Sequence, residues 1–346
     1  MNREQISNIR LQNQQLVKSN FEKPDELVEW MGAVQAQDLP MSLLAIAVRT
    51  KNETVKSVEN AFNEGKLIRT HLMRPTWHIV SHRDIYWMLD LTTVQIKRTI
   101  GGRHNELELS KEILSKANRL LEKHLESTTL SRDEIKAIFH ENKLRTDENR
   151  LSHLLFNAEM EQIICNGEVK GHLQTYSLLE EKVPNKIKLP REEALMKLGR
   201  SFFKSHGPAT TADFVWWSGL PMKDIRWVIE ELKSEMEMIK YEDTEFYFFG
   251  NPEIKPSLKS GILLLPSYDE FLISYQSKHI SINLEHRTKA ATMNGIFKPI
   301  IVQNGEIIGT WKTSGTKKGI SFEPQFFDNV KVDLDKEISK LLDILS

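Results

Sequence analysis

The chain has 346 residues, of which 40% are hydrophobic and 27% charged, and its formal net charge at pH 7 is −1. This composition is typical of a folded globular protein with room for two or three compact units. A near-neutral total excludes a uniformly basic surface, so any nucleic-acid site must be a local patch. Cys165 is the only cysteine, which excludes an intramolecular disulfide and a zinc site built on several cysteines.

The N-terminal stretch MNREQISNIRLQNQQL is polar and has no apolar signal core. No run of about eighteen apolar residues occurs, so no membrane span is expected. Together with the single cysteine, these features favour a reducing, cytoplasmic compartment.

Along the chain, one arrangement is predicted three times: two or three short helices followed by two strands. In the first copy, helices around Asp25–Val34 and Thr54–Asn63 precede the strand-like KLIRTHLMRPTWHIV. In the second copy, Ser131 and Glu134 form a capping-box pattern at the start of a helix. A helix in TDENRLSHLLFNAEMEQ follows, and then two strands around Asn166-Gly167, a dipeptide typical of tight turns.

The third copy begins with the helix REEALMKLGRSFFKSH, which ends at Gly207-Pro208. A short helix then closes at Gly219, another begins near Pro221, and MIKYEDTEFYFFG is predicted as a strand pair. The segment Trp216–Gly219 is predicted to lie in the core of this copy rather than to stack on bases.

From about Pro256 the pattern changes to short strands separated by Gly, Asn and Pro, with Asn304-Gly305 as a hairpin turn. The final stretch VDLDKEISKLLDILS reads as an amphipathic helix. These features predict a small β-barrel or sandwich closed by a helix. Tyr268, Asp269 and Glu270 are placed at a strand end, where the two adjacent carboxylates point to opposite faces and favour a turn or barrel corner over acid–base catalysis.

The predicted fold is therefore α+β, with three tandem winged-helix modules followed by a small C-terminal β-barrel and a terminal helix. The expected boundaries are 1–125, 126–188, 189–252 and 253–346. A winged helix uses its second helix and its hairpin against nucleic acid. Small helical modules with hairpins also serve as protein-interaction domains, and that alternative stays open here.

Two segments are locally basic. Residues 65–104 and residues 278–318 each carry a formal net charge of +5. If both face one groove, they form a bipartite phosphate-binding surface. The alternative is that each is a solvated face balanced by acidic neighbours in space.

Within the first basic segment, RTHLMRPTWHI alternates Arg69, His71, Trp77 and His78 with apolar residues, a pattern that suits a strand pair tracking a nucleic-acid backbone and stacking on a base. The alternative is a core Trp77 with arginines extending from it to solvent. The histidines show no metal-ligand spacing, and no P-loop, GxGxxG or GxSxG motif occurs. Neither a metal nor a small-molecule cofactor is expected.

Six segments in order are similar to one family: VQAQDLP, RTHLMRPTWHIV, YSLLEEKVP, SHGPATTADFVWWSGL, LLPSYDEFLISY and IIVQNGEIIGTWK. They cover most of the chain and resemble the bacterial winged-helix DNA glycosylases of the AlkZ type, which excise alkylated bases and unhook interstrand crosslinks. That family has three winged-helix modules and a β-barrel, and a Gln-x-Gln or Gln-x-Asp catalytic signature. Gln35-Ala36-Gln37 matches the Gln-x-Gln branch. Many relatives are known only as DNA-binding proteins, so membership alone does not establish activity.

The resemblance implies that Gln35 and Gln37 position the hydrolytic water, with Asp38 as a helper or a structural cap. A purine alkylated at N7 is cationic and leaves as a neutral base, so the site needs positioning rather than a strong general acid. Two side chains two residues apart share a side of an extended segment but not of a helix. We therefore expect Gln35–Asp38 at a helix end or in a loop, with Pro40 limiting regular continuation.

The expected DNA-binding residues are Arg69, His71, Arg74, Trp77, Arg98 and Arg103. Arg69 and Arg74 are the nearest candidates for phosphate contact, and the hairpin around Val302–Trp311 is a candidate for contact with DNA. Because crosslinked bases resist full flipping, the lesion is expected to be reached within the duplex.

The expected partner is double-stranded DNA, bound by a monomer that associates with the nucleoid when on DNA. Two other functions stay open: a non-catalytic winged-helix regulator, and an interaction scaffold that no longer binds nucleic acid.

Overall fold

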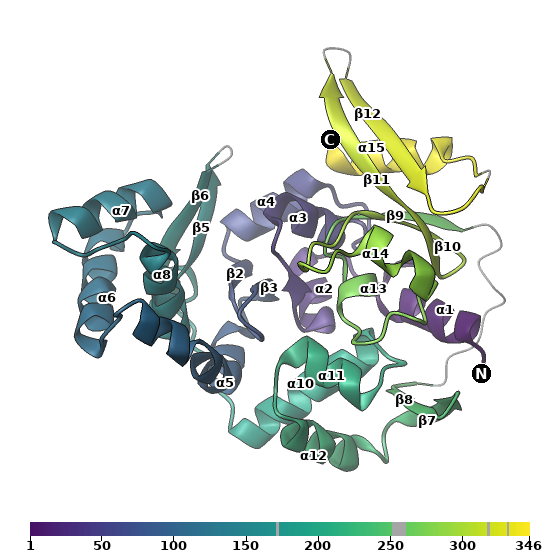
Figure 1. Ribbon diagram of the computed structural model, residues 1–346, viewed down its shortest axis with the longest axis horizontal. Helices are drawn as coiled ribbons and strands as arrows, with labels where there is room; N and C mark the ends of the chain where they lie inside the picture. Colours follow the sequence, from purple (N-terminus) through teal and green to yellow (C-terminus); the bar gives the residue numbers. More distant parts are fainter. Residues whose placement is uncertain (171–172, 251–260, 317–318, 331) are drawn as a thin grey trace.

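A computed structural model describes residues 1–170, 173–250, 261–316, 319–330 and 332–346. It shows a mixed α+β fold whose elements fall into four groups along the chain (Figure 1). The first group comprises α1 (Arg3–Asn13), α2 (Pro24–Met31), β1 (Val34–Gln35), α3 (Leu39–Ala47), α4 (Val55–Asn63), β2 (Leu67–His71), β3 (Trp77–Ser81) and α5 (Ile85–Glu106). Its antiparallel sheet has the order β1-β3-β2, so the short strand β1 lies against β3.

The second and third groups each combine helices with a strand pair, as predicted. The second comprises α6 (Lys111–Leu125), β4 (Leu130–Ser131), α7 (Arg132–Glu141), α8 (Arg150–Met160), β5 (Ile164–Lys170), β6 (Leu173–Leu178) and α9 (Leu179–Lys182). The third comprises α10 (Arg191–Ser205), α11 (Thr211–Ser218), α12 (Met222–Leu232), β7 (Glu237–Tyr241) and β8 (Thr244–Phe248). The predicted capping box of Ser131 and Glu134 is confirmed at α7, and Gly219 closes α11 in a left-handed conformation.

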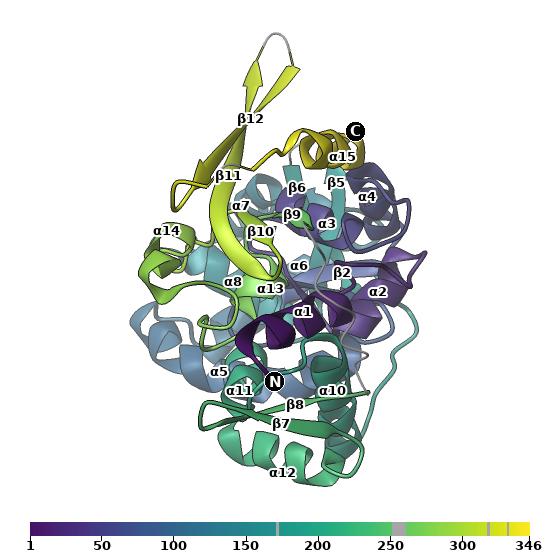
Figure 2. The same cartoon turned by 90° about the vertical axis from the view of Figure 1, so that its right-hand side faces the viewer.

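The fourth group comprises β9 (Ile262–Leu265), α13 (Glu270–Ile273), the 3-10 helix η1 (Leu284–His286), α14 (Arg287–Ala290), β10 (Ile300–Gln303), β11 (Glu306–Thr316), β12 (Gly319–Phe326) and α15 (Asp335–Leu345). The predicted hairpin turn at Asn304-Gly305 and the terminal helix are confirmed. The predicted barrel is wrong for the described strands, which form an open sheet of order β12-β11-β10-β9. The β11–β12 ribbon projects away from the body of the molecule (Figures 1 and 2), so its outer part has no opposite strands to close on.

Two other local predictions are corrected. Asn166-Gly167 is not the turn of the second strand pair: both residues lie within β5, at a register irregularity. A Cβ on Gly167 would come within 2.6 Å of the Thr175 and Ser177 hydroxyl oxygens, so glycine is required by close packing. Tyr268–Glu270 does not end a strand, because β9 stops at Leu265 and Asp269 caps α13 by accepting from the Phe271 N–H at 2.9 Å.

Some predicted features fall outside the described residues: the boundary near residue 253 and the side chains of Lys317 and Lys318. Over the described ranges, no helix is both long enough and apolar enough to cross a membrane.

The fourth group is held to the first by a buried ion pair. Arg49, which follows α3, donates through both terminal nitrogens to the Asp269 carboxylate at 2.8 Å each, and both side chains are at most 1% exposed. Helix α1 reinforces this packing, because Ser7 donates to the Gly305 carbonyl and Arg10 donates to the Pro208 carbonyl. The fourth group is thereby fixed relative to the first and third.

Arg49→Met is expected to destabilise the protein by about 3–5 kcal/mol, because it leaves the buried Asp269 carboxylate without its cation. Thermal unfolding of the variant measures this loss. An exposed pair serves as control: Lys56→Met, which removes a partner of Glu59 on α4, is expected to change the unfolding free energy by less than about 1 kcal/mol. Equal effects of the two substitutions would contradict the prediction.

Candidate functional site

The Gln-x-Gln segment bridges strand β1 and helix α3. Gln35 ends β1 opposite His78 of β3, and Asp38 is the N-cap of α3, accepting from the Met41 N–H at 3.3 Å. The expectation of a non-helical segment at a helix end is therefore confirmed for Gln35–Asp38. Gln35 is 4% exposed, whereas Gln37 and Asp38 are exposed. The side-chain amide of Gln35 is therefore the inner one and that of Gln37 the outer one. Asp38 makes the contact of a helix cap.

Glu270 anchors the backbone of Gln35. Its Oε1 accepts the Gln35 backbone N–H at 2.5 Å, and its Oε2 accepts from the Trp217 indole at 3.3 Å and from the Ser274 hydroxyl. His206 Nε2 lies 3.4 Å from the same oxygen. Burial raises the pKa of Glu270, but His206, Ser274 and the Gln35 N–H outweigh it and hold the pKa at about 2. Glu270 is therefore a buried, ionised carboxylate that fixes the position of Gln35.

Arg74 contacts the inner amide from the front. Its Nη2 donates to Gln35 Oε1 at 3.3 Å, and its guanidinium lies 5.3 Å from the ring centre of Trp216. Burial lowers the pKa of Arg74, while Glu270 opposes that shift. No ion pair joins Arg74 to a carboxylate in the described part of the chain, so its charge is available to an anion beside Gln35. Trp217 is 1% exposed and lies in the core as predicted, but Trp216 is 39% exposed and lies beside the site.

Arg69, an expected phosphate contact, is buried in the structure. Arg69 is 3% exposed; its Nε donates to the Ala36 carbonyl at 2.9 Å and its Nη1 to Asn166 Oδ1 at 2.6 Å. Its guanidinium also lies 4.2 Å from the Trp77 ring centre. Burial lowers its pKa to about 10. Arg69 thus supports the Gln-x-Gln backbone from inside the protein and does not face the surface.

His71 and Trp77 lie on the other face of the β2–β3 hairpin. In the antiparallel register His71 is opposite Trp77. His78, the next residue of β3, pairs with Thr70 of β2 on one side and with Gln35 of β1 on the other. Directly opposed residues share a face and neighbours alternate, so His71 and Trp77 point away from Gln35. Both are half-buried and their rings lie 3.8 Å apart, where they line a cavity against the second group.

The basic segment 65–104 is largely paired with carboxylates. Four of its cations make ion pairs at 2.7–2.9 Å: Lys66, Arg83, Lys97 and Arg103. Arg98 on α5 is exposed and has no ion-pair partner within the described ranges. The Arg103–Glu106 pair is exposed, so an anionic ligand competes with it at little cost. Arg98 and Arg103 are thus both accessible. For most of the other cations of the segment, acidic neighbours balance the positive charge, as the alternative interpretation expects.

The two basic segments approach one another near Lys278. This lysine is 5% exposed, and its ammonium lies 5.3 Å from the Trp216 ring centre, the same distance as Arg74. Burial lowers its pKa to about 7; Asp213 opposes the shift, and Arg74 and Arg287 add to it. Since Arg74 belongs to one basic segment and Arg287 to the other, positive potential from both converges beside Gln35.

Gly219 sets the position of the Arg74 loop. Its φ is +69°, and a Cβ there would come within 2.9 Å of the Arg74 backbone nitrogen and 3.1 Å of its Cγ. Gly219→Ala is therefore expected to displace Arg74, to cost about 1–3 kcal/mol of stability, and to weaken DNA binding. Gly250→Ala is the control, since its φ is +90° but its Cβ would meet nothing within 4 Å. Thermal unfolding and DNA affinity of both variants check this, and equal losses of affinity would contradict it.

Sequence reasoning missed Glu270, Trp216 and Lys278. The sequence favours a turn or barrel corner for Glu270, and because its contact with Gln35 spans 235 positions, no local pattern indicates it. Trp216 had a signal: adjacent residues on a helix point in directions about 100° apart, so two neighbouring tryptophans do not both face one core. Lys278 is one of the cations in a basic segment, and its polar neighbours Gln276, Ser277 and His279 give no sign of its burial.

The chain belongs to a class of DNA-repair enzymes that hydrolyse N-glycosyl bonds. Over residues 28–343 the chain matches the family described as DNA glycosylase AlkZ-like, and it is a member of that family. Because glycosylases of this family act on DNA, DNA is the substrate polymer that membership implies.

Two matches come from Streptomyces sahachiroi, one to a curated sequence and one to a solved structure. The protein named Interstrand DNA cross-link repair glycosylase is 23% identical over 325 residues, which make up 88% of this chain and 85% of the relative. The solved structure of Streptomyces sahachiroi DNA glycosylase AlkZ matches with a TM-score of 0.79 at 19% identity, covering 99% of this chain and 96% of that one. The second match shows that the fold is shared.

Proposed function

We propose that this glycosylase hydrolyses the N-glycosidic bond of N7-alkylated purines, including crosslinked ones, with Gln35 and Gln37 together positioning the water. The observation that carries the proposal is the arrangement of the Gln-x-Gln segment: Gln35 is held between Glu270 and Arg74 while Gln37 is exposed one step outward. A polar residue with a purely structural role at a helix end does not require a buried carboxylate on its backbone N–H and an arginine on its side-chain oxygen.

The chemistry follows from the cationic substrate. An N7-alkylated purine departs as a neutral base, so the leaving group needs no protonation, and the barrier is lowered by holding water below C1′ and stabilising an oxocarbenium-like sugar. Because Arg74 already donates to the Gln35 oxygen, the Gln35 NH₂ is the end left to donate to substrate oxygens. The Gln37 carbonyl then accepts from the attacking water. Asp38 keeps the cap of α3 and serves no proton transfer.

Each of the first three groups is interpreted as a winged-helix module carrying a strand pair, with boundaries near 1–125, 126–188 and 189–252. The fourth group supplies the projecting β11–β12 ribbon (Figure 2), a shape that enters a DNA groove. Cations without carboxylate partners in the described ranges supply the phosphate contacts: Arg74, Arg98, Arg287 and Lys298. His71 and Trp77 remain proposed DNA contacts on the opposite face of the hairpin.

One assay tests the proposal. The protein is incubated with duplex DNA containing a single N7-methylguanine, and abasic sites are then cleaved with alkali. Strand breaks at the modified guanine and none at an unmodified one are expected. Binding without breaks supports a non-catalytic regulator, and the absence of binding at low salt supports a scaffold, so either result contradicts the proposal.

A further inference from the structure

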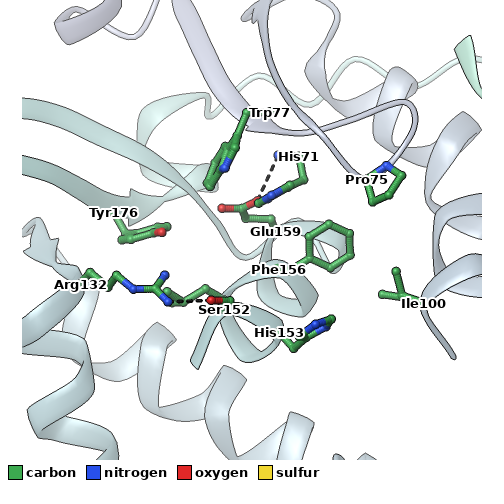
Figure 3. A pocket seen from close by; sticks show the side chains of 11 residues that line it. His71, Pro75, Trp77, Ile100, Arg132, Ser152, His153, Phe156, Glu159 and Tyr176 are labelled. Atoms are coloured by element: carbon green, nitrogen blue, oxygen red, sulfur yellow. Dashed lines mark hydrogen bonds and ion pairs between the residues drawn. The ribbon is translucent and has the colours of Figure 1, made fainter. Parts of the chain in front are cut away.

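A cavity of about 280 Å³ lies between the β2–β3 hairpin and the second group (Figure 3). Trp77, Phe156 and Tyr176 form aromatic walls, and the His71 ring lies 4.6 Å from Phe156 in an edge-on arrangement. Its polar lining includes the Glu159 carboxylate from α8. Flat, mostly aromatic walls with a few directed polar groups are typical of a site for a planar ligand.

Glu159 has an unused acceptor at this cavity. The residue is fully buried; its Oε2 accepts the His71 backbone N–H at 3.0 Å and lies 2.5 Å from His71 Nδ1. Its Oε1 is buried and accepts no hydrogen bond from the described residues. A buried carboxylate oxygen without a donor is unfavourable, so the cavity calls for a ligand with an N–H at that position.

The rim of the cavity is cationic. Arg132, at the start of α7, is exposed, and its Nη2 donates to the Ser152 hydroxyl at 2.7 Å (Figure 3). An arginine on the rim, aromatic walls and a carboxylate acceptor inside match the three parts of a nucleotide: phosphate, base ring and exocyclic amine. The geometry points to an extrahelical purine nucleotide of the bound DNA as the ligand: its base lies against Trp77 and Tyr176, and its amino group donates to Glu159.

This base is not the one that is cut. Trp77 and His71 lie on the face of the hairpin opposite Gln35, so a base in the cavity does not present its own glycosidic bond to the inner amide. A crosslinked purine is tethered to the other strand, whereas an unpaired purine beside it is free to leave the stack. The cavity therefore receives a second nucleotide while the lesion stays in the duplex. This inference rests on the proposed function for its ligand, DNA, but not on the catalytic role of Gln35 and Gln37.

The test uses unmodified duplexes that carry one unpaired 2-aminopurine, whose fluorescence falls on stacking with an aromatic ring. The wild-type protein is expected to bind this duplex about tenfold more tightly than a fully paired one and to quench its fluorescence. Ser152→Phe, which fills the cavity from its rim, and Glu159→Gln are both expected to abolish that preference. Glu141→Gln, an exposed change of the same charge on α7, is the control and keeps the preference.

The outcomes separate this inference from the proposed function. Equal affinity of the wild type for both duplexes, or an unchanged preference in Ser152→Phe, overturns the inference and leaves the cavity to water. Gln35→Ala is expected to retain the preference because it does not touch the cavity. Preference without cleavage of N7-methylguanine refutes only the proposed function, and cleavage without preference refutes only the nucleotide site.

Discussion

Gln37→Ala is expected to cleave N7-methylguanine from DNA about 100-fold more slowly than the wild type, with an unchanged melting temperature. Gln37 is exposed and its side chain has no hydrogen-bond partner among the described residues, so its removal costs the fold nothing. The loss then falls on the step in which water is held below the sugar. Single-turnover cleavage rates and thermal unfolding of the same preparation measure the two effects.

Gln35→Ala is expected to differ from Gln37→Ala, because it affects stability as well as cleavage. It removes the acceptor of the Arg74 guanidinium from a nearly buried position, so it is expected to lower both the cleavage rate and the melting temperature. Gln12→Ala on α1 is the matched control, because that half-buried side chain makes no hydrogen bond with the described residues. A Gln37→Ala variant that cleaves at the wild-type rate would remove the outer amide from the mechanism.

Glu270→Gln is expected to destabilise the protein by about 3–5 kcal/mol at neutral pH and to lower the cleavage rate as well. The four groups that converge on this carboxylate then face an amide, whose NH₂ cannot accept from them. The Gln35 N–H loses its charged acceptor, so the inner amide is no longer held in place. Glu285→Gln, exposed in the same group, is the control for the change in charge.

Acid unfolding tests the same residue in another way. The folded-state pKa of Glu270 is about 2, below its ordinary value of 4.5, so the stability that this carboxylate supplies is fully present above pH 4.5. It is lost as the pH falls from 4.5 towards 2, and it amounts to about 3 kcal/mol. Glu270→Gln should therefore flatten the dependence of the unfolding free energy on pH within this window. An identical slope in the variant and the wild type would show that Glu270 is not the titrating group.

Most helices were predictable because their signals are local. The Ser131 capping box, Gly219 and the apolar periodicity of α10 and α12 each act within a few residues. Asn166-Gly167 misled for the opposite reason. Asn166 accepts a hydrogen bond from Arg69, and Gly167 packs against Thr175 and Ser177. These contacts with distant residues, and not a turn, explain why Asn and Gly occur here. Whether a set of strands closes into a barrel is likewise decided by pairings between distant segments.

The candidate site was predictable only from its motif and from the charge of its segments. Gln35 and Gln37 carry a motif, and a charge count indicated basic segments, but burial is invisible in a charge count. Arg69 therefore seemed equivalent to Arg74, although one is enclosed under Ala36 and the other faces Gln35. Glu270, Trp216 and the unused oxygen of Glu159 depend on distances that only the folded chain defines.

The dependence of Gln35 on Glu270 also bears on synthesis of the protein. A ribosome makes the Gln-x-Gln segment early, yet the carboxylate that holds it arrives 235 residues later, together with its link through Arg49 and Asp269. A nascent or prematurely terminated chain that stops before Glu270 therefore carries the two amides without their support. Since the contact that holds Gln35 is then missing, we expect a chain that ends before Glu270 to show no glycosylase activity.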